Sequence, residues 1–185
     1  AIGAEEVDRL ELSLTVFEAL ARRVAAECPQ WQGFGLALQA YQTRALELVQ
    51  HVIGVARQHG IRLMCRLVKG AYWDAEIKRA QELGLPHYPV FTEKHHTDAS
   101  YLACARALLA APDAIYPQFA THNAGTIAAI LQMAGASGTE QPPGRPKAAN
   151  APSGGNAVPQ GTSVGANNFE MQRLHGMGEG VYREV

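Results

Sequence analysis

Arg66-Leu-Val-Lys-Gly-Ala-Tyr-Trp-Asp74 is the stretch of this chain that decides its fold. An apolar run over 61–68 ends there abruptly, which predicts a strand that stops at this point. At its end the chain offers the cations of Arg66 and Lys69, and then Gly70, which lets backbone approach a ligand closely. Two flat aromatic rings follow. This combination suits a large, flat, anionic ligand such as a flavin dinucleotide.

Two periodicities alternate along the rest of the chain. Short apolar runs predict strands over 34–39, 61–68, 115–121 and 169–174. Apolar stripes at helical spacing predict helices over 6–26, about 46–56 with Gly60 as the stop, about 74–83, around 102–109 and over 123–134. Repeated strand–helix units indicate an α/β fold with a parallel sheet, because parallel neighbours need a crossover helix.

The parity of the strands favours a barrel over an open sheet. In 61–68 the face that would meet the helices carries Ile61, Leu63, Cys65 and Leu67, and the other carries Arg62, Met64, Arg66 and Val68. A polar or small inner face near the carboxyl end is typical of a barrel mouth. A complete eight-stranded barrel takes about 250 residues. We therefore predict a partial (β/α)8 TIM-type barrel of about four parallel strands, incomplete at both ends.

Composition excludes several classes of protein. The net charge is −1 and the cations are scattered, so no basic field recruits nucleic acid. No apolar run approaches the roughly 20 residues that span a bilayer. Three well-separated cysteines predict buried thiols in a reducing compartment rather than a disulfide framework. The segment 135–166 is rich in Gly, Pro, Ser, Asn and Ala, which predicts a disordered surface insertion.

Polar residues recur where the predicted strands end. Parallel strands bring their carboxyl ends to one edge, where functional residues usually lie. The sets are Gln39, the cations and rings from Arg66 to Trp73, Thr121-His122-Asn123, and Gln172 with Leu174. Lys69 there could form a Schiff base or pair with a phosphate or carboxylate. Adjacent His95 and His96 lack an acidic cluster, so we expect no metal site.

The chain resembles the proline dehydrogenase barrel of the bacterial proline utilization A flavoenzymes. Besides the stretch quoted first, the resemblance rests on Ala4-Glu-Glu-Val-Asp-Arg-Leu-Glu11, Gln39-Ala-Tyr-Gln42, Tyr88-Pro-Val-Phe-Thr92, Ile115-Tyr-Pro-Gln-Phe-Ala-Thr-His-Asn123 and Leu174-His-Gly-Met-Gly-Glu179. It covers most of the chain outside 135–166. One departure is Gly3, which stands where members of this family carry an acidic residue.

The resemblance implies a barrel that holds FAD and oxidises L-proline to 1-pyrroline-5-carboxylate in the cytoplasm. Electrons would pass to quinone at the membrane surface, so the enzyme would associate with the membrane peripherally during turnover. An aldehyde dehydrogenase domain on the same polypeptide is a further implied partner. Gln39 and Arg66 would meet the flavin ring and are the catalytic candidates. The other cofactor residues would be Val68, Lys69, Gly70, Ala71, Tyr72, Trp73, Thr92, Lys94, Thr121, His122, Asn123, Gln172 and Leu174.

The isolated 185-residue chain is expected to be catalytically silent and to bind FAD weakly, because the residues that grip the substrate carboxylate in this family lie outside it. Two other functions stay open at the level of sequence. One is a barrel lyase that uses Lys69 as a Schiff-base amine. The other is a non-catalytic barrel remnant that only self-associates through its sheet edges.

Overall fold

The computed structural model describes residues 2–3, 6–137 and 168–183. Its strands form one parallel sheet in the sequential order β1-β2-β3-β4-β5. The strands are β1 (Ile2–Gly3), β2 (Gly35–Gln39), β3 (Leu63–Val68), β4 (Ile115–Ala120) and β5 (Glu170–Gln172). The four predicted strands and their parallel arrangement are therefore confirmed, and the two-residue β1 is an addition.

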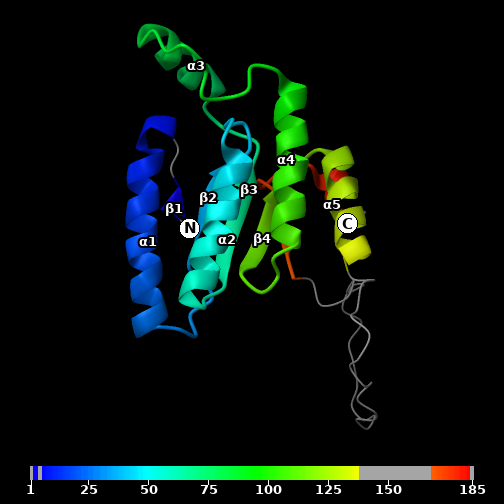
Figure 1. Ribbon diagram of the computed structural model, residues 1–185. Coiled ribbons are helices and arrows are strands. Elements are labelled where there is room, and N and C mark those ends of the chain that lie inside the picture. Colours follow the sequence, from blue (N-terminus) through cyan, green and yellow to red (C-terminus); the bar gives the residue numbers. More distant parts are fainter. Residues whose placement is uncertain (1, 4–5, 138–167, 184–185) are drawn as a thin grey trace.

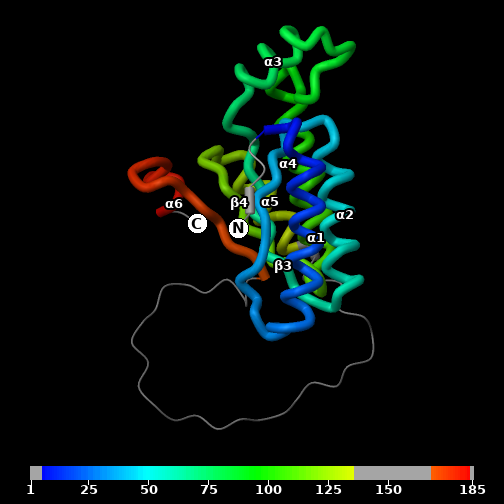
Figure 2. The backbone as a smooth tube through the Cα atoms, turned by 90° about the vertical axis from the view of Figure 1, so that its left-hand side faces the viewer, coloured from blue at the N-terminus to red at the C-terminus, as the bar shows by residue number. Residues whose placement is uncertain are grey.

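Helices connect the strands, and α1, α2 and α4 lie along one side of the sheet (Figures 1 and 2). They are α1 (Leu10–Glu27), preceded by the 3-10 turn Val7–Arg9, α2 (Ala45–His59), α3 (Trp73–Glu82), α4 (Lys94–Leu109), α5 (Ala124–Ser137) and α6 (Glu179–Tyr182). Gly60 ends α2 in the left-handed conformation with φ 62°, as its position in the sequence predicts. Figure 2 shows α1 and α2 on one side of the strands and α6 on the other.

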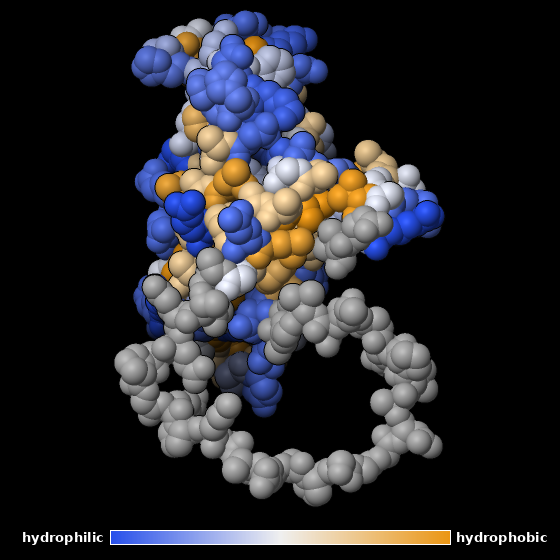
Figure 3. All heavy atoms as spheres, turned by 90° about the vertical axis from the view of Figure 1, so that its right-hand side faces the viewer, coloured by the Kyte–Doolittle hydropathy of each residue, from blue (hydrophilic) through white to orange (hydrophobic). Residues whose placement is uncertain are grey.

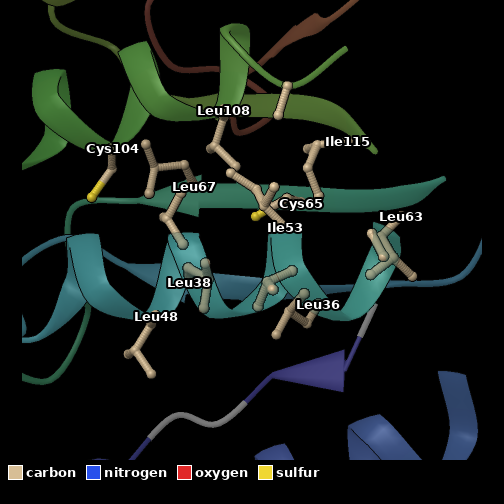
Figure 4. Close-up of a cluster of buried hydrophobic side chains, with 14 of the residues drawn as sticks. Leu36, Leu38, Leu48, Ile53, Leu63, Cys65, Leu67, Cys104, Leu108 and Ile115 are labelled. Atoms are coloured by element: carbon tan, nitrogen blue, oxygen red, sulfur yellow. The ribbon is translucent and has the colours of Figure 1, made fainter. Parts of the chain in front are cut away.

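The core lies between the strands and the helical layer (Figure 4). Leu63, Cys65 and Leu67 of β3 are fully buried, whereas the residues between them are only partly buried. This alternation is the one that the sequence predicts for a strand with one face on the helices. Tyr101 and Leu108 of α4 complete the centre of the core and are also fully buried. One side of the sheet is thus left for a site.

The opposite face of the sheet carries a transverse row of residues at one level. Ala37 pairs with Arg66, Arg66 with Gln118 and Gln118 with Glu170 in the parallel register. Gln39, Val68 and Gln172 lie two positions nearer the carboxyl ends of their strands. Because side chains two apart share a face, both levels point away from the helical layer.

Beyond the strand ends, α3 and its following loop project from the rest of the molecule (Figure 1). Figure 3 shows that this projecting part is mainly hydrophilic, while the face beneath it is largely apolar. Across the described ranges, no helix combines the length and the apolar character that a membrane crossing needs.

The cysteines and the segment 135–166 differ in part from what the sequence predicts. Cys65 and Cys104 are buried, but Cys28 is exposed, because it lies just beyond the end of α1 where the chain turns. The expectation of three buried thiols was therefore wrong for Cys28. The predicted insertion at 135–166 overlaps α5, which continues to Ser137, and its remainder lies outside the described residues.

Candidate functional site: a cationic cleft at the strand ends

A cleft of about 370 Å³ opens at the carboxyl ends of β2, β3, β4 and β5. Its lining is mainly apolar, with a few convergent polar groups, as is usual for cofactor sites. It is lined by Ala37, Gln39, Arg66, Val68, Lys69, Gly70, Ala71, Tyr72, Ala120, His122, Gln172, Arg173 and Leu174. All four strand-end sets of the sequence contribute to this one cleft.

Arg66 crosses the floor of the cleft toward β5. Its Nε donates a hydrogen bond of 2.7 Å to Oε1 of Gln172. Among the described residues this is the only hydrogen bond of the Arg66 side chain, so its terminal nitrogens remain available as donors. A guanidinium held on one edge and open on the other is suited to an anionic or electron-rich ligand.

The turn after β3 forms one wall of the cleft. The backbone N–H of Ala71 donates to Oε1 of Gln39 over 3.3 Å, which ties this turn to β2. Trp73 is fixed at the start of α3, because its Nε1 donates to the carbonyl oxygen of Phe91 over 2.8 Å. The residues Tyr72 and Trp73 are 44% and 41% exposed, so their rings can pack against a ligand.

Two neighbouring clefts meet the first one at Lys69. One, of about 380 Å³, contains Trp73, Thr92 and Lys94, and is lined further by Tyr41, Lys69, Gly70, Phe91, Thr97 and Asp98. The other, of about 410 Å³, is lined by Lys69, Lys94, Ala120, Thr121, His122 and Asn123. Together the three clefts form a continuous surface whose common member is a cation.

Asp98 links the two lysines of this surface. Its Oδ1 accepts a hydrogen bond from Nζ of Lys69, and its Oδ2 accepts one from Nζ of Lys94 over 2.6 Å. The pKa of the Asp98 carboxyl lies below its ordinary value. The hydrogen bond from Lys69 is the largest cause, and the hydrogen bond from Lys94 is the next. Two ammonium groups share one carboxylate, so the cluster keeps one net positive charge for an anion.

The ion pair also bears on the Schiff-base alternative. An amine must be neutral to attack a carbonyl group. Lys69 instead sits as an ammonium donor to Asp98, with the second cation of Lys94 on the same carboxylate. This arrangement favours anion binding over nucleophilic catalysis.

His122 and Asn123 are held by local hydrogen bonds after β4. Nε2 of His122 accepts from the backbone N–H of Leu174 over 3.0 Å, which leaves the proton of a neutral ring on Nδ1. Oδ1 of Asn123 accepts from the backbone N–H of Thr126 over 2.9 Å and so caps the start of α5. His122 therefore connects the end of β4 to the end of β5, and Asn123 stabilises the first turn of α5.

The structure brings all fifteen sequence-predicted site residues to these three clefts, ten of them to the first. Sequence reasoning missed Ala37, Ala120 and Arg173 in the first cleft, and Tyr41, Phe91, Thr97 and Asp98 in the second. The parity of β2 and β4 already places both alanines on the inner face. Asp98 lies four residues after Lys94, a spacing that favours an ion pair on a helix.

A metal centre finds no support in the described parts of the chain. No three or more His, Cys, Asp and Glu side chains gather there in a way that could hold an ion. His95 and His96 instead contact each other edge to face, with ring centroids 4.3 Å apart. The chemistry of the site is therefore that of cations, amides and aromatic rings.

A parallel sheet with a cationic cleft at its carboxyl edge is the arrangement of part of an α/β barrel with a candidate ligand site. Residues 1–143 match the family described as proline dehydrogenase. The chain belongs to the proline dehydrogenase family. Over 184 residues it is 48% identical to the bifunctional protein PutA of Klebsiella aerogenes and to that of Escherichia coli, and 45% identical to that of Rhizobium meliloti.

These matches take in the whole of this chain but only 12% to 13% of the length of those relatives. Solved structures agree. A variant of proline utilization A from Bradyrhizobium japonicum is 49% identical, with a TM-score of 0.78 over 98% of this chain and 16% of its own. The Bdellovibrio bacteriovorus protein, inactivated by N-propargylglycine, is 31% identical with the same TM-score. The predicted α/β fold, as part of a barrel, is thereby confirmed.

Proposed function

We propose that this chain supplies the cofactor-binding wall of an FAD-dependent proline dehydrogenase. The parent enzyme oxidises L-proline to 1-pyrroline-5-carboxylate and passes the electrons to quinone at the membrane surface, with an aldehyde dehydrogenase domain as a partner on the same polypeptide. The observation that carries the proposal is the meeting of all four strand-end sets in one cleft, with Lys69 joining it to two further clefts.

The residues present fit an FAD molecule. A dinucleotide needs a flat apolar slot for its ring system and cations for its diphosphate. The first cleft offers the slot, with Val68 and Ala71 in its lining and the ring of Tyr72 at its side. Lys69 and Lys94 offer the cations, since their shared carboxylate neutralises only one of them.

Bound FAD would supply hydride acceptance, and the protein's part is orientation and electrostatics. Arg66 holds a permanent positive charge at the cleft floor, where it stabilises negative charge on a ligand ring. Gln39 fixes the turn that bears Ala71 and so sets the distance between the two walls. Lys69 and Lys94, which now share Asp98, would hold the diphosphate of a bound dinucleotide.

FAD binding by this chain tests the proposal directly. We expect saturable quenching of FAD fluorescence on titration with the chain, and about tenfold weaker binding for Lys69→Gln, since one charge-assisted hydrogen bond to phosphate is lost. Lys78→Gln is the matched control, because Lys78 is 76% exposed on α3 and lines none of the three clefts. Equal affinities of the two variants would contradict the placement of the diphosphate.

A chimera tests the activity. The chain aligns end to end with a segment of the Klebsiella aerogenes protein, so it can replace that segment in the longer protein. We expect the chimera to retain proline-dependent reduction of a dye and to lose at least tenfold in kcat when Arg66 becomes Gln. Arg57→Gln is the control, because Arg57 pairs with Asp113 on the opposite side of the core. A folded, FAD-loaded chimera without proline oxidation would refute the proposed activity.

A further inference from the structure

A carboxylate lies on the inner face of the sheet, one level below Gln172, which lines the cleft. It belongs to Glu170, the first residue of β5. In the parallel register Glu170 pairs with Gln118, which in turn pairs with Arg66. An acid therefore stands two strands away from the guanidinium of Arg66, at the same level of the sheet.

The side chains above and beside Glu170 form a continuous hydrogen-bonded chain. Oε1 of Glu170 accepts from Nε2 of Gln172 over 2.6 Å and from Nε2 of Gln118 over 2.8 Å. Oε1 of Gln172 accepts from Nε of Arg66 over 2.7 Å. All these groups are partly buried, so water competes less with the contacts than it would on the open surface.

The direction of each hydrogen bond in this row of side chains is fixed by the residues at its two ends. Arg66 can only donate, and the Glu170 carboxylate can only accept. The amide of Gln172 lies between them, so its nitrogen must face Glu170 and its oxygen must face Arg66. If the amide turned over, an N–H group would face the guanidinium and an oxygen would face the carboxylate.

We propose that Glu170 is a positioning residue, which fixes the amide of Gln172 and through it the orientation of the Arg66 guanidinium in the cleft. The proposal deepens the proposed function and rests on it only for the identity of the ligand. Glu170 itself does not line the cleft, whereas Gln172 and Arg66 do. Its effect on a ligand therefore passes through these two side chains.

The first test measures the Arg66 side chain itself, in the full 185-residue chain without ligand. The Nε–H group of Arg66 is assigned in a ¹⁵N–¹H spectrum by comparison with Arg66→Lys, and its exchange with water is followed. Glu170→Met removes the acceptor and keeps the volume, so we expect about tenfold faster exchange. Glu170→Gln keeps an oxygen for both amide nitrogens, so exchange should stay within about threefold of the wild-type rate.

A double variant separates positioning from fold or charge effects. A carboxylate at position 172 offers oxygen to Arg66 whichever way it turns, so Glu170→Met combined with Gln172→Glu should restore slow exchange. Gln118→Leu is the matched control, because it removes the other donor to Glu170 and leaves the contact with Gln172 in place. Circular dichroism verifies that each variant is folded.

The outcomes are decisive. The proposal is overturned if Glu170→Met leaves the exchange rate unchanged, if Glu170→Gln is as impaired as Glu170→Met, or if the double variant shows no rescue. A separate FAD titration should give about tenfold weaker binding for Glu170→Met and near wild-type binding for Glu170→Gln. If the wild-type chain binds no FAD while the exchange results hold, the proposed function fails and the positioning role stands.

Discussion

Gly70 lies so close to the ring of Tyr41 that a Cβ atom on Gly70 would be 2.4 Å from both Cγ and Cδ2 of that ring. Tyr41 is 2% exposed and cannot move aside freely. The turn after β3 also adopts φ 154° at Gly70, which side chains disfavour. Glycine is therefore required at position 70 because the ring of Tyr41 leaves no room for a side chain there, whether or not a ligand also approaches this turn.

Gly70→Ala is expected to destabilise the chain. Overpacking against a buried ring costs about 1–3 kcal/mol, and thermal unfolding followed by circular dichroism measures the loss. Because the turn bears Ala71 and Tyr72, we also expect weaker FAD binding. An unchanged unfolding temperature would show that the ring of Tyr41 can move away at little cost.

Gly54→Ala is the matched control for this substitution. Gly54 lies within α2, and a Cβ there would meet nothing within 4 Å. Alanine is favoured over glycine in a helix interior by about 1 kcal/mol. The two glycine substitutions should therefore shift the unfolding temperature in opposite directions.

The strands, the face that packs on the helices and the edge that carries the site could all be predicted from the sequence. Leu63, Cys65 and Leu67 alternate with Met64, Arg66 and Val68, and the structure buries the first set fully and the second only in part. The β1 strand could not be predicted, because two residues show no period. Its pairing with β2 is a purely tertiary event.

The contacts within the site were less accessible to sequence reasoning. Gln172 and Arg66 are 106 residues apart in the chain, and only the strand order brings them within hydrogen-bond distance. The role of Asp98 likewise depends on where Lys69 lies after β3. The sequence identifies the residue types at each strand end. The partners of each side chain depend on how neighbouring strands align and on the order in which the connecting helices place them.

Asp98→Asn should change the acid stability of the chain. The pKa of Asp98 is lowered in the folded state, so its ion pairs stabilise the protein fully above the unfolded pKa of about 3.9. That stabilisation disappears as the pH falls through the lowered folded value. The side chain is 36% exposed, so we expect a difference of less than about 1 kcal/mol at pH 7.

Unfolding temperatures of the wild type and of Asp98→Asn, measured from pH 7 to pH 3, provide the check. The gap between them should be constant above about pH 5 and should narrow below about pH 4. Asp113→Asn serves as a second acidic variant, because Asp113 pairs with Arg57 away from the clefts. A gap for Asp98→Asn that widens on acidification would contradict the proposed role of the two lysines.

Tyr182→Phe should loosen the junction of β4 and β5. The Tyr182 hydroxyl lies 2.7 Å from the carbonyl oxygen of Thr121 and 2.8 Å from that of Gln172, and it can donate to either. Loss of this partly buried hydrogen bond should cost about 1 kcal/mol in the free energy of unfolding. Hydrogen exchange at the ends of both strands should also accelerate.

The control for Tyr182 is Tyr88→Phe. Tyr88 is 39% exposed, and its hydroxyl accepts from Nε2 of Gln81 over 3.1 Å in the projecting part of the molecule. Loss of the Tyr88 hydroxyl should change the free energy of unfolding by less than about 0.5 kcal/mol. Equal effects of the two substitutions would show that the Tyr182 hydroxyl does not hold the strand ends together.

The three thiols should differ sharply in reactivity. Burial raises the pKa of Cys65 to about 12 and that of Cys104 to about 11, whereas Cys28 is exposed. Because the thiolate is the reactive form, a disulfide reagent at pH 8 should modify one thiol per native chain and all three in denaturant. Cys28→Ser should abolish the fast reaction, and Cys104→Ser should leave it unchanged. Rapid modification of Cys65 in the folded chain would mean that the contact between β3 and α4 opens readily, which the packed core in Figure 4 argues against.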